Sequence, residues 1–341
     1  AFFSSSGSEA NDTVVRMVRR YWDLKGQPRK KTFISREYAY HGSTMTGVSL
    51  GGMTAMHDQG GMMPGFEHVM PPYWYKYGAD MSPEEFGIFT ANKIEEKIQE
   101  IGSENIAAFI GEPIQGAGGV IIPPDSYWPR VQEICNKYDI LLVVDEVICG
   151  FGRTGEWFGS NTYNIKPDII TMAKGISSGY IPLSGIMVGN RVTETLIDEG
   201  GEFYHGYTYS GHPVACAVAI ENIKIIREEN LIENSRNTSV YLEERMKEIS
   251  EHPLVGEVRM KSFIGAVELV KDKEKGKMFE EVGVTGGICR DYCIQNGLIM
   301  RAVRDGMIFC PPLIFNHNHI DELVEKLKKS LDQTHDHISK S

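Results

Sequence analysis

Two short apolar segments, each ending in a charged residue, constrain the fold of this chain more than any other feature. Residues 140–144 are all Ile, Leu or Val and run directly into Asp145, and residues 169–173 are mostly apolar and lead to Lys174. Short apolar runs between turn signals suit strands that are buried on both faces of a parallel sheet. Ligands of such sheets bind beyond the carboxyl ends of the strands. The sequence therefore predicts an α/β fold that brings a carboxylate and an amine to one edge.

The bulk composition excludes several classes of protein. The 341 residues are enough for about two domains, and the apolar and charged fractions, 41% and 24%, are those of an ordinary globular protein. No apolar run approaches the ~18–20 residues of a membrane span. A net charge of −11 argues against nucleic acid or an anionic membrane as a partner. The six scattered cysteines indicate reduced thiols and a reducing, cytoplasmic compartment, and their spacing predicts no metal site.

Helical and strand patterns alternate over most of the chain and then change in texture. Residues 1–250 are predicted to form a large α/β domain, and residues 251–341, where short strands mix with helices, a smaller α+β domain. Residues 51–77 are rich in Gly, Met, Pro and aromatic residues without a period, so we predict a long loop there.

Two further loops have the composition of ligand-binding segments. Small residues at 4–8, among them Gly7 and Ser8, precede a helical pattern, and the free N–H groups at such a helix start can bind a phosphate. An ordinary helix cap would have the same composition. A turn at 38–44 contains Tyr40 and His41, and an aromatic side chain packed beneath a loop is its simplest interpretation.

The motifs together resemble the cofactor signature of the class III (ω-) aminotransferases. The matching residues are Asp145-Glu146-Val147, the glycine-rich turn that follows, and Lys174, twenty-nine positions after Asp145. Ser-Gly-Ser-Glu-Ala-Asn and Tyr-His-Gly extend the resemblance over essentially the whole chain. It implies the pyridoxal 5′-phosphate (PLP) transferase fold of type I: a mostly parallel central sheet with helices on both faces, and a smaller α+β C-terminal domain.

The resemblance gives Lys174 and Asp145 catalytic roles. Lys174 would hold PLP covalently, and Asp145 would keep the cofactor ring nitrogen protonated. A lysine that attacks an aldehyde must be neutral part of the time, so we expect Lys174 to be buried. Val147 lies two positions after Asp145, on the same strand face, and is expected to pack under the ring.

The resemblance also implies other site residues. Those expected to bind the cofactor, besides Asp145, Val147 and Lys174, are Gly7, Ser8, Tyr40, His41, Glu112 and Thr208. Thr208 would reach the cofactor phosphate of a neighbouring subunit, which implies a homodimer. Arg301 would bind a substrate carboxylate through its planar fork.

The implied activity is the transfer of an amino group from a primary amine or ω-amino acid to a keto acid such as pyruvate, by a ping-pong mechanism. Ala117, where ornithine-type members usually carry an acidic residue, favours the amine:pyruvate branch. The opening Ala1-Phe2-Phe3 runs straight into the phosphate loop, so we expect that the natural N-terminal segment is missing, and a chain without it could bind the cofactor yet turn over poorly.

Two alternatives to amino transfer remain open, and a third is rejected. A PLP-dependent aminomutase or decarboxylase on the same fold would carry the same motifs. Residues 175–179 satisfy G-x-S-x-G, a motif of serine hydrolases in which Ser177 would be the nucleophile. A nucleophile elbow requires a helix immediately after the serine, and Pro182 argues against one. A glycine cluster at 115–119 lacks dinucleotide-binding spacing, and nicotinamide binding is rejected.

Overall fold

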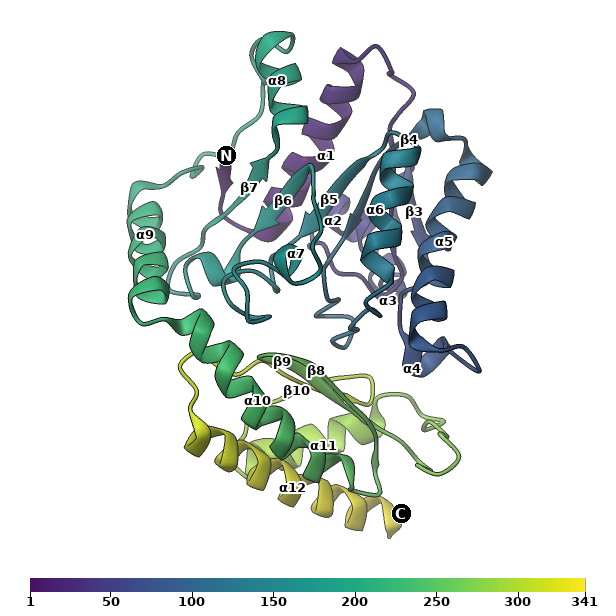
Figure 1. Ribbon diagram of the computed structural model, residues 1–341, viewed down its shortest axis with the longest axis vertical. Helices are drawn as coiled ribbons and strands as arrows, with labels where there is room; N and C mark the ends of the chain where they lie inside the picture. The colour runs from purple at the N-terminus through teal and green to yellow at the C-terminus, as the bar shows by residue number, and fades with distance from the viewer. Residues whose placement is uncertain (341) are drawn as a thin grey trace. The chain divides into compact units, whose positions relative to one another are not determined.

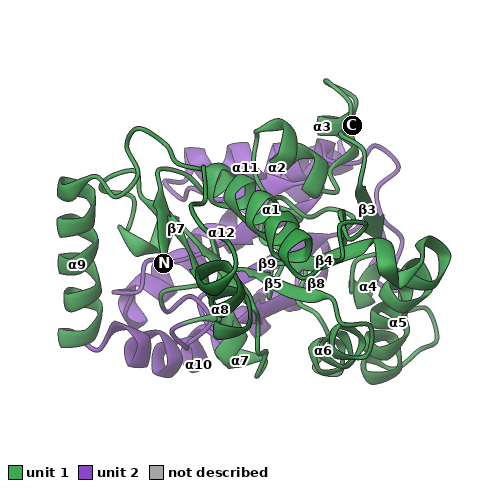
Figure 2. Cartoon of the chain, turned by 90° about the horizontal axis from the view of Figure 1, so that it is seen from above, with its two compact units in different colours: residues 1–151, 158–228 green, residues 152–157, 229–341 purple. Residues whose placement is uncertain are grey.

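A computed structural model describes residues 1–340, which form two compact units. The first consists of residues 1–151 and 158–228, and the second of residues 152–157 and 229–341 (Figure 2). The domain boundary predicted near residue 250 falls at the end of a helix that this division groups with the second unit.

The first unit is built on one seven-stranded sheet. Its strands are β1 (Phe2–Ser4), β2 (Thr32–Arg36), β3 (Phe66–Val69), β4 (Ile106–Gly111), β5 (Leu141–Asp145), β6 (Ile169–Met172) and β7 (Ser184–Val188). They lie in the order β1-β7-β6-β5-β4-β2-β3. All pairs from β6 to β3 are parallel, and β7 is antiparallel to both β6 and β1. The predicted mostly parallel sheet is confirmed.

The first unit has helices on both faces of its sheet and others beside it. They are α1 (Gly7–Leu24), α2 (Met45–Leu50), α3 (Thr54–His57), α4 (Trp74–Tyr77), α5 (Pro83–Ile101), α6 (Tyr127–Lys137), α7 (Gly159–Thr162), α8 (Asn190–Asp198) and α9 (Pro213–Glu228), with single 3-10 turns η1 (Ser103–Asn105) and η2 (Lys174–Ile176). Helix α1 contacts β4, β6 and β7 on one face, whereas α5 contacts β3 and α6 contacts β5 on the other (Figure 1). This double covering explains why every residue of β4 and β5 is buried.

The stretch predicted as a loop at residues 51–77 contains α3, β3 and α4, so that prediction is wrong in part. Strand β3 is the edge strand of the sheet and pairs with β2. Its two middle residues, Glu67 and His68, are polar and half-buried. A four-residue edge strand with polar residues at its centre shows no apolar run, which is why the sequence pattern missed it.

The second unit is an antiparallel sheet packed against helices. Its elements are α10 (Leu231–Ser250), β8 (Val255–Lys261), β9 (Ile264–Leu269), α11 (Val284–Gln295), β10 (Arg301–Val303), β11 (Gly306–Phe309) and α12 (His317–Ser339). The strand order is β10-β11-β9-β8. One apolar cluster joins the sheet to all three helices, and it includes both buried cysteines of α11, Cys289 and Cys293. The predicted α+β character of the C-terminal part is thus confirmed.

Candidate active site

Asp145 and Lys174 follow neighbouring strands at the carboxyl edge of the first unit's sheet. Asp145 ends β5, where its register partner on the parallel strand β6 is Thr171. The chain continues three residues beyond Thr171 to Lys174, which opens η2. Because paired strands lie about 4.8 Å apart, the two segments leave the sheet side by side.

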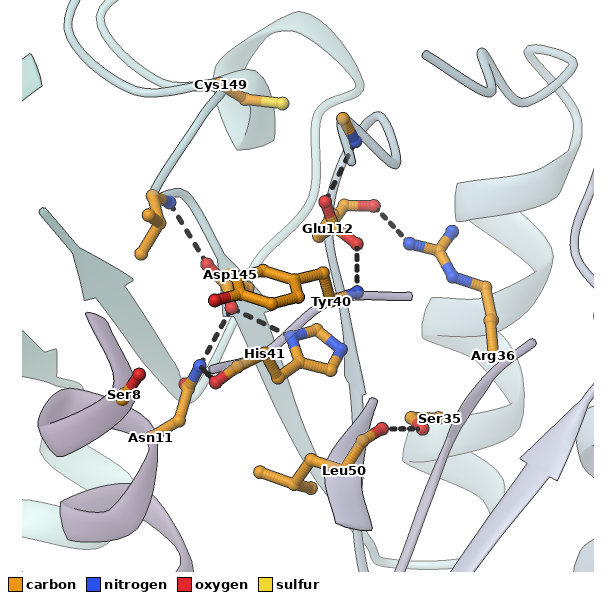
Figure 3. Close-up of polar contacts among 12 residues, drawn as sticks. Ser8, Asn11, Ser35, Arg36, Tyr40, His41, Leu50, Glu112, Asp145 and Cys149 are labelled. Atoms are coloured by element: carbon orange, nitrogen blue, oxygen red, sulfur yellow. Dashed lines mark hydrogen bonds and ion pairs between the residues drawn. The ribbon is translucent and has the colours of Figure 1, made fainter. Parts of the chain in front are cut away.

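The carboxylate of Asp145 is held by three hydrogen bonds (Figure 3). His41 Nδ1 lies 2.8 Å from Oδ2, and Asn11 Nδ2 donates to the same oxygen over 2.9 Å. The backbone N–H of Val147 donates to Oδ1 over 3.1 Å. Asn11 also donates to the carbonyl oxygen of His41 over 2.8 Å, so one amide group fixes both His41 and Asp145.

The environment keeps Asp145 ionised despite its burial. Burial by itself raises the pKa of this carboxyl group, but the hydrogen bond and charge of His41, together with donation from Asn11 and Val147, hold the pKa below its usual range. Asp145 is only 3% exposed, so the site presents a fixed negative charge with little water around it. A cationic ring nitrogen is the kind of ligand that such a charge favours.

Replacing Asn11 with alanine should lower the free energy of unfolding by about 2 kcal/mol, because two buried hydrogen bonds are lost and His41 O and Asp145 Oδ2 each lose a donor. Urea unfolding measures this change. The control is Asn136→Ala, which removes an exposed amide from α6 and should cost less than about 0.5 kcal/mol. Equal losses in the two variants would contradict the role of Asn11.

Glu112 and Tyr40 form a second layer beside Asp145. The backbone N–H of Tyr40 donates to Glu112 Oε1 over 3.3 Å, and the N–H of Gly116 donates to Oε2 over 2.9 Å. The guanidinium of Arg36 donates to the backbone carbonyl of Glu112. Burial raises the pKa of Glu112, and the charges of His41 and Arg36 only partly oppose that rise.

The N-terminus of α1 lies against the same strand ends. A Cβ added to Gly7 would stand 3.3 Å from Val147 Cγ2 and 3.8 Å from Ala173 Cβ, so the loop before α1 meets the residues that follow Asp145 and precede Lys174. Ser8 Oγ accepts the backbone N–H of Ser43 over 3.1 Å, which ties this helix start to the loop after His41. The three segments singled out in the sequence therefore meet in one place.

Three predicted site residues are exposed. The side chain of Lys174 is exposed, so the burial that we expected for it is not found in this chain. Thr208 is also exposed and follows Tyr207, whose hydroxyl donates to Glu9 O over 3.0 Å at the start of α1. Arg301 opens β10 in the second unit with its side chain exposed.

Ser177 does not have the setting of a hydrolase nucleophile. Its hydroxyl donates to Ile181 O over 2.7 Å, and the residue is only 2% exposed. It follows the single 3-10 turn η2 rather than opening a helix. The structure thus gives no support to the serine-hydrolase alternative, as the absence of a following helix indicated.

Glu146 is a buried carboxyl group that the sequence analysis passed over as a neighbour of Asp145. Its Oε1 accepts from Ser160 N over 2.6 Å and from Ser160 Oγ over 2.7 Å, and its Oε2 accepts from Gly159 N over 2.9 Å. It anchors the start of α7 to the end of β5. Burial nevertheless raises the pKa of Glu146 to about 7, against the effect of these donors.

The stability that Glu146 contributes should depend on pH. The pKa of Glu146 is higher in the folded chain than the value of 4.5 of a free side chain, so the folded state binds the proton more tightly than the unfolded state does. The stability that this group contributes is therefore lost as the pH rises from about 4.5 through about 7. The free energy of unfolding, relative to that of Glu146→Gln, should fall by roughly 3 kcal/mol across this range. Urea unfolding at several pH values measures it. Exposed Glu194→Gln is the control, and a pH-independent difference for Glu146→Gln would contradict the assignment.

Asn11 is the other site residue that the sequence analysis did not single out. It belongs to the string that resembles a phosphate loop, but it lies on the buried face of α1 with Ala10, Val14 and Val18. A polar residue on an otherwise apolar helix face is the signal that could have identified it, because a buried amide requires partners.

The described residues fit a phosphorylated pyridinium cofactor and offer no alternative metal site. Within residues 1–340 no three His, Cys, Asp or Glu side chains are grouped to hold a metal ion. None of the described helices has the length and apolar character needed to cross a bilayer. Such a cofactor needs a ring-nitrogen partner, a phosphate seat and a covalent anchor, and the buried charge of Asp145, the small residues at the start of α1 and the amine of Lys174 have the matching chemistry.

Comparison with known proteins agrees with this fit. The family Aminotransferase class-III matches residues 1–331. The putrescine–pyruvate aminotransferase of Pseudomonas aeruginosa is 59% identical over 98% of this chain and 73% of its own length. The ω-transaminase of Pseudomonas jessenii, solved in complex with PMP, superimposes with a TM-score of 0.95 at 46% identity, covering 98% of this chain and 75% of that one.

A second solved structure, a transaminase with L-Ala, superimposes with a TM-score of 0.96 at 43% identity and covers 99% of this chain and 81% of that one. The family match over nearly the whole chain and the superposition on solved transaminases both agree with the site geometry, in which Asp145 and Lys174 follow neighbouring strands at one edge of the sheet. The chain belongs to the class III aminotransferases, enzymes of PLP fold type I that depend on pyridoxal 5′-phosphate.

Proposed function

We propose that this chain transfers an amino group from a primary amine or ω-amino acid to a keto acid such as pyruvate, with Lys174 and Asp145 as its catalytic residues. The observation that carries the proposal is the buried, hydrogen-bonded carboxyl group of Asp145 at the end of β5, beside the strand that leads to Lys174. The naming of a 59% identical relative as a putrescine–pyruvate aminotransferase supports an amine donor and pyruvate as acceptor.

Bound PLP supplies an electron sink that stabilises negative charge on the substrate carbon. Asp145 maintains that sink, because its fixed negative charge keeps the ring nitrogen protonated. Lys174 would hold the cofactor through its aldehyde group. When free, its amine would move the proton at the substrate carbon, as general base and then general acid.

Other residues would hold the cofactor in place. Gly7 and Ser8 would bind the phosphate at the start of α1, where backbone N–H groups and the helix dipole favour an anion. Tyr40 and Val147 would cover the two faces of the ring and keep water away. His41 would act through Asp145, and its hydrogen bond to Asp145 Oδ2 supports this role. Glu112 would border the substituent side of the ring.

Residues outside this cluster complete the proposal. Arg301 would bind a substrate carboxylate, and the exposed Thr208 would reach the cofactor phosphate of a second subunit, so we propose a homodimer. A cytoplasmic location is consistent with the six scattered cysteines of the sequence. The 59% identical relative, named as an aminotransferase, favours amino transfer over the aminomutase and decarboxylase alternatives, which release different products.

Borohydride reduction of the protein after incubation with PLP tests the proposal. Peptide mapping should place a phosphopyridoxyl group on Lys174, and incubation with putrescine and pyruvate should form alanine. Label on another lysine, or none, would refute the assigned site. Carbon dioxide or an isomerised amine in place of alanine would point to the decarboxylase or the aminomutase.

A further inference from the structure

One side chain fastens the turn that carries Lys174 to helix α9. Asn222 Nδ2 donates to Gly175 O over 2.9 Å and to Ile176 O over 3.0 Å. Its Oδ1 accepts from Ser178 Oγ over 2.7 Å. Asn222 is only 9% exposed, and helix α9, which carries it, packs against η2. All three polar positions of one amide are therefore used on residues that follow Lys174.

This turn needs external support because its backbone is unfavourable. Lys174 has φ +42° and Ser178 has φ +48°, both in the left-handed region that side chains other than glycine rarely adopt. Within the turn, Ile176 N and Ser177 N each donate over 3.2 Å, to Ala173 O and Lys174 O. A single 3-10 turn that begins at one such residue and is followed two residues later by the other is weakly stabilised by itself.

The opposite side of the turn rests on the glycine-rich segment after β5. A Cβ added to Gly175 would stand 3.0 Å from Phe151 Cβ and 3.3 Å from Gly150 O. The turn is thus fixed between Phe151 and Asn222. Since the Lys174 side chain is itself exposed, its direction is set by the backbone that carries it rather than by packing around it.

We propose that Asn222 is a positioning residue for the reaction. Its hydrogen bonds hold the backbone of residues 174–178 in place and thereby orient the amine of Lys174. The inference rests on the proposed function of Lys174. An asparagine suits this position because it offers two N–H groups to adjacent carbonyls and one oxygen to a hydroxyl. Aspartate has nearly the same shape but donates nothing, and it would place a negative charge against the two carbonyl oxygens.

The test distinguishes the orientation of the Lys174 amine from its exposure to solvent. The full chain is incubated with limiting PLP and trapped with borohydride, and the rate of labelling at Lys174 is measured by mass spectrometry. In parallel, acetic anhydride labels all exposed amines, with Lys166 as the internal reference. Asn222→Asp should lower the rate of PLP capture at Lys174 roughly tenfold, because two hydrogen bonds are lost, while acetylation of Lys174 relative to Lys166 stays unchanged.

Asn222→Ser, which retains one donor, provides a second variant should Asn222→Asp fold poorly, and its loss should be smaller. Asn136→Asp is the matched control and should capture PLP at the wild-type rate. Wild-type capture in whichever Asn222 variant folds would overturn the inference, as would an equal fall in acetylation at Lys174. Failure of the wild-type chain to capture PLP at Lys174 would instead refute the proposed function.

Discussion

Replacing Lys174 with alanine should reduce kcat/KM for amino transfer by at least about 10³-fold. The variant loses the amine that we propose links to the cofactor and moves the proton, and proton transfer by a positioned side chain alone accounts for about 10²–10⁴-fold. The exposed Lys174 side chain has no buried contacts to lose, so the free energy of unfolding should change little. Amine-dependent formation of alanine from pyruvate measures the activity.

The matched control is Lys166→Ala, which removes another exposed lysine from the same unit and should keep the wild-type rate. Thermal unfolding of both variants verifies that they are folded. If Lys174→Ala retained more than about a tenth of the wild-type kcat/KM, neither covalent linkage nor proton transfer could be assigned to this residue.

Replacing Asp145 with asparagine should lower kcat/KM by about 10²–10³-fold, the range found when one preorganised electrostatic contact is removed. The amide keeps the size of the side chain and can still accept from His41, but it carries no charge to keep the cofactor ring nitrogen protonated. We expect the loss mainly in kcat, since the phosphate seat at the start of α1 is untouched. Steady-state kinetics with saturating PLP separates kcat from KM.

Asp198→Asn provides the comparison for Asp145, because it removes an exposed carboxylate at the end of α8 and should not alter kcat. A loss confined to KM, with kcat preserved, would show that Asp145 serves substrate binding rather than the electronics of the cofactor. A loss of the folded state in Asp145→Asn, seen by circular dichroism, would assign Asp145 a structural role in place of a chemical one.

The strands that lead to Asp145 and Lys174 could be read from the sequence because burial on both faces leaves a continuous apolar run. Strand β4, which is also buried at every residue, has the same kind of apolar run. The pattern failed for β3, whose two middle residues are polar and half-buried, and for β1, whose three residues are too few to show a pattern. Edge strands are held by backbone pairing, which leaves little trace in side-chain type.

The hydrogen-bond partners of the site residues could not be predicted from the sequence. Nothing in the pattern indicated that Asn11 bonds to Asp145, since 134 positions separate them and the contact arises only when α1 packs against the ends of β5 and β6. The expected burial of Lys174 was likewise wrong for this chain, because burial depends on what surrounds the turn rather than on the strand before it.

By itself, the sequence determined the family, the cofactor, the parallel sheet and the residue types at its carboxyl edge, because these depend on local runs and on spacing along the chain. Only the tertiary structure decided which groups hold Asp145 ionised, that Glu146 supports α7, and that Asn222 on α9 fastens the turn of Lys174. The physical reason is that hydrogen bonds between distant segments form after packing has brought them together, and no local period of the chain encodes them.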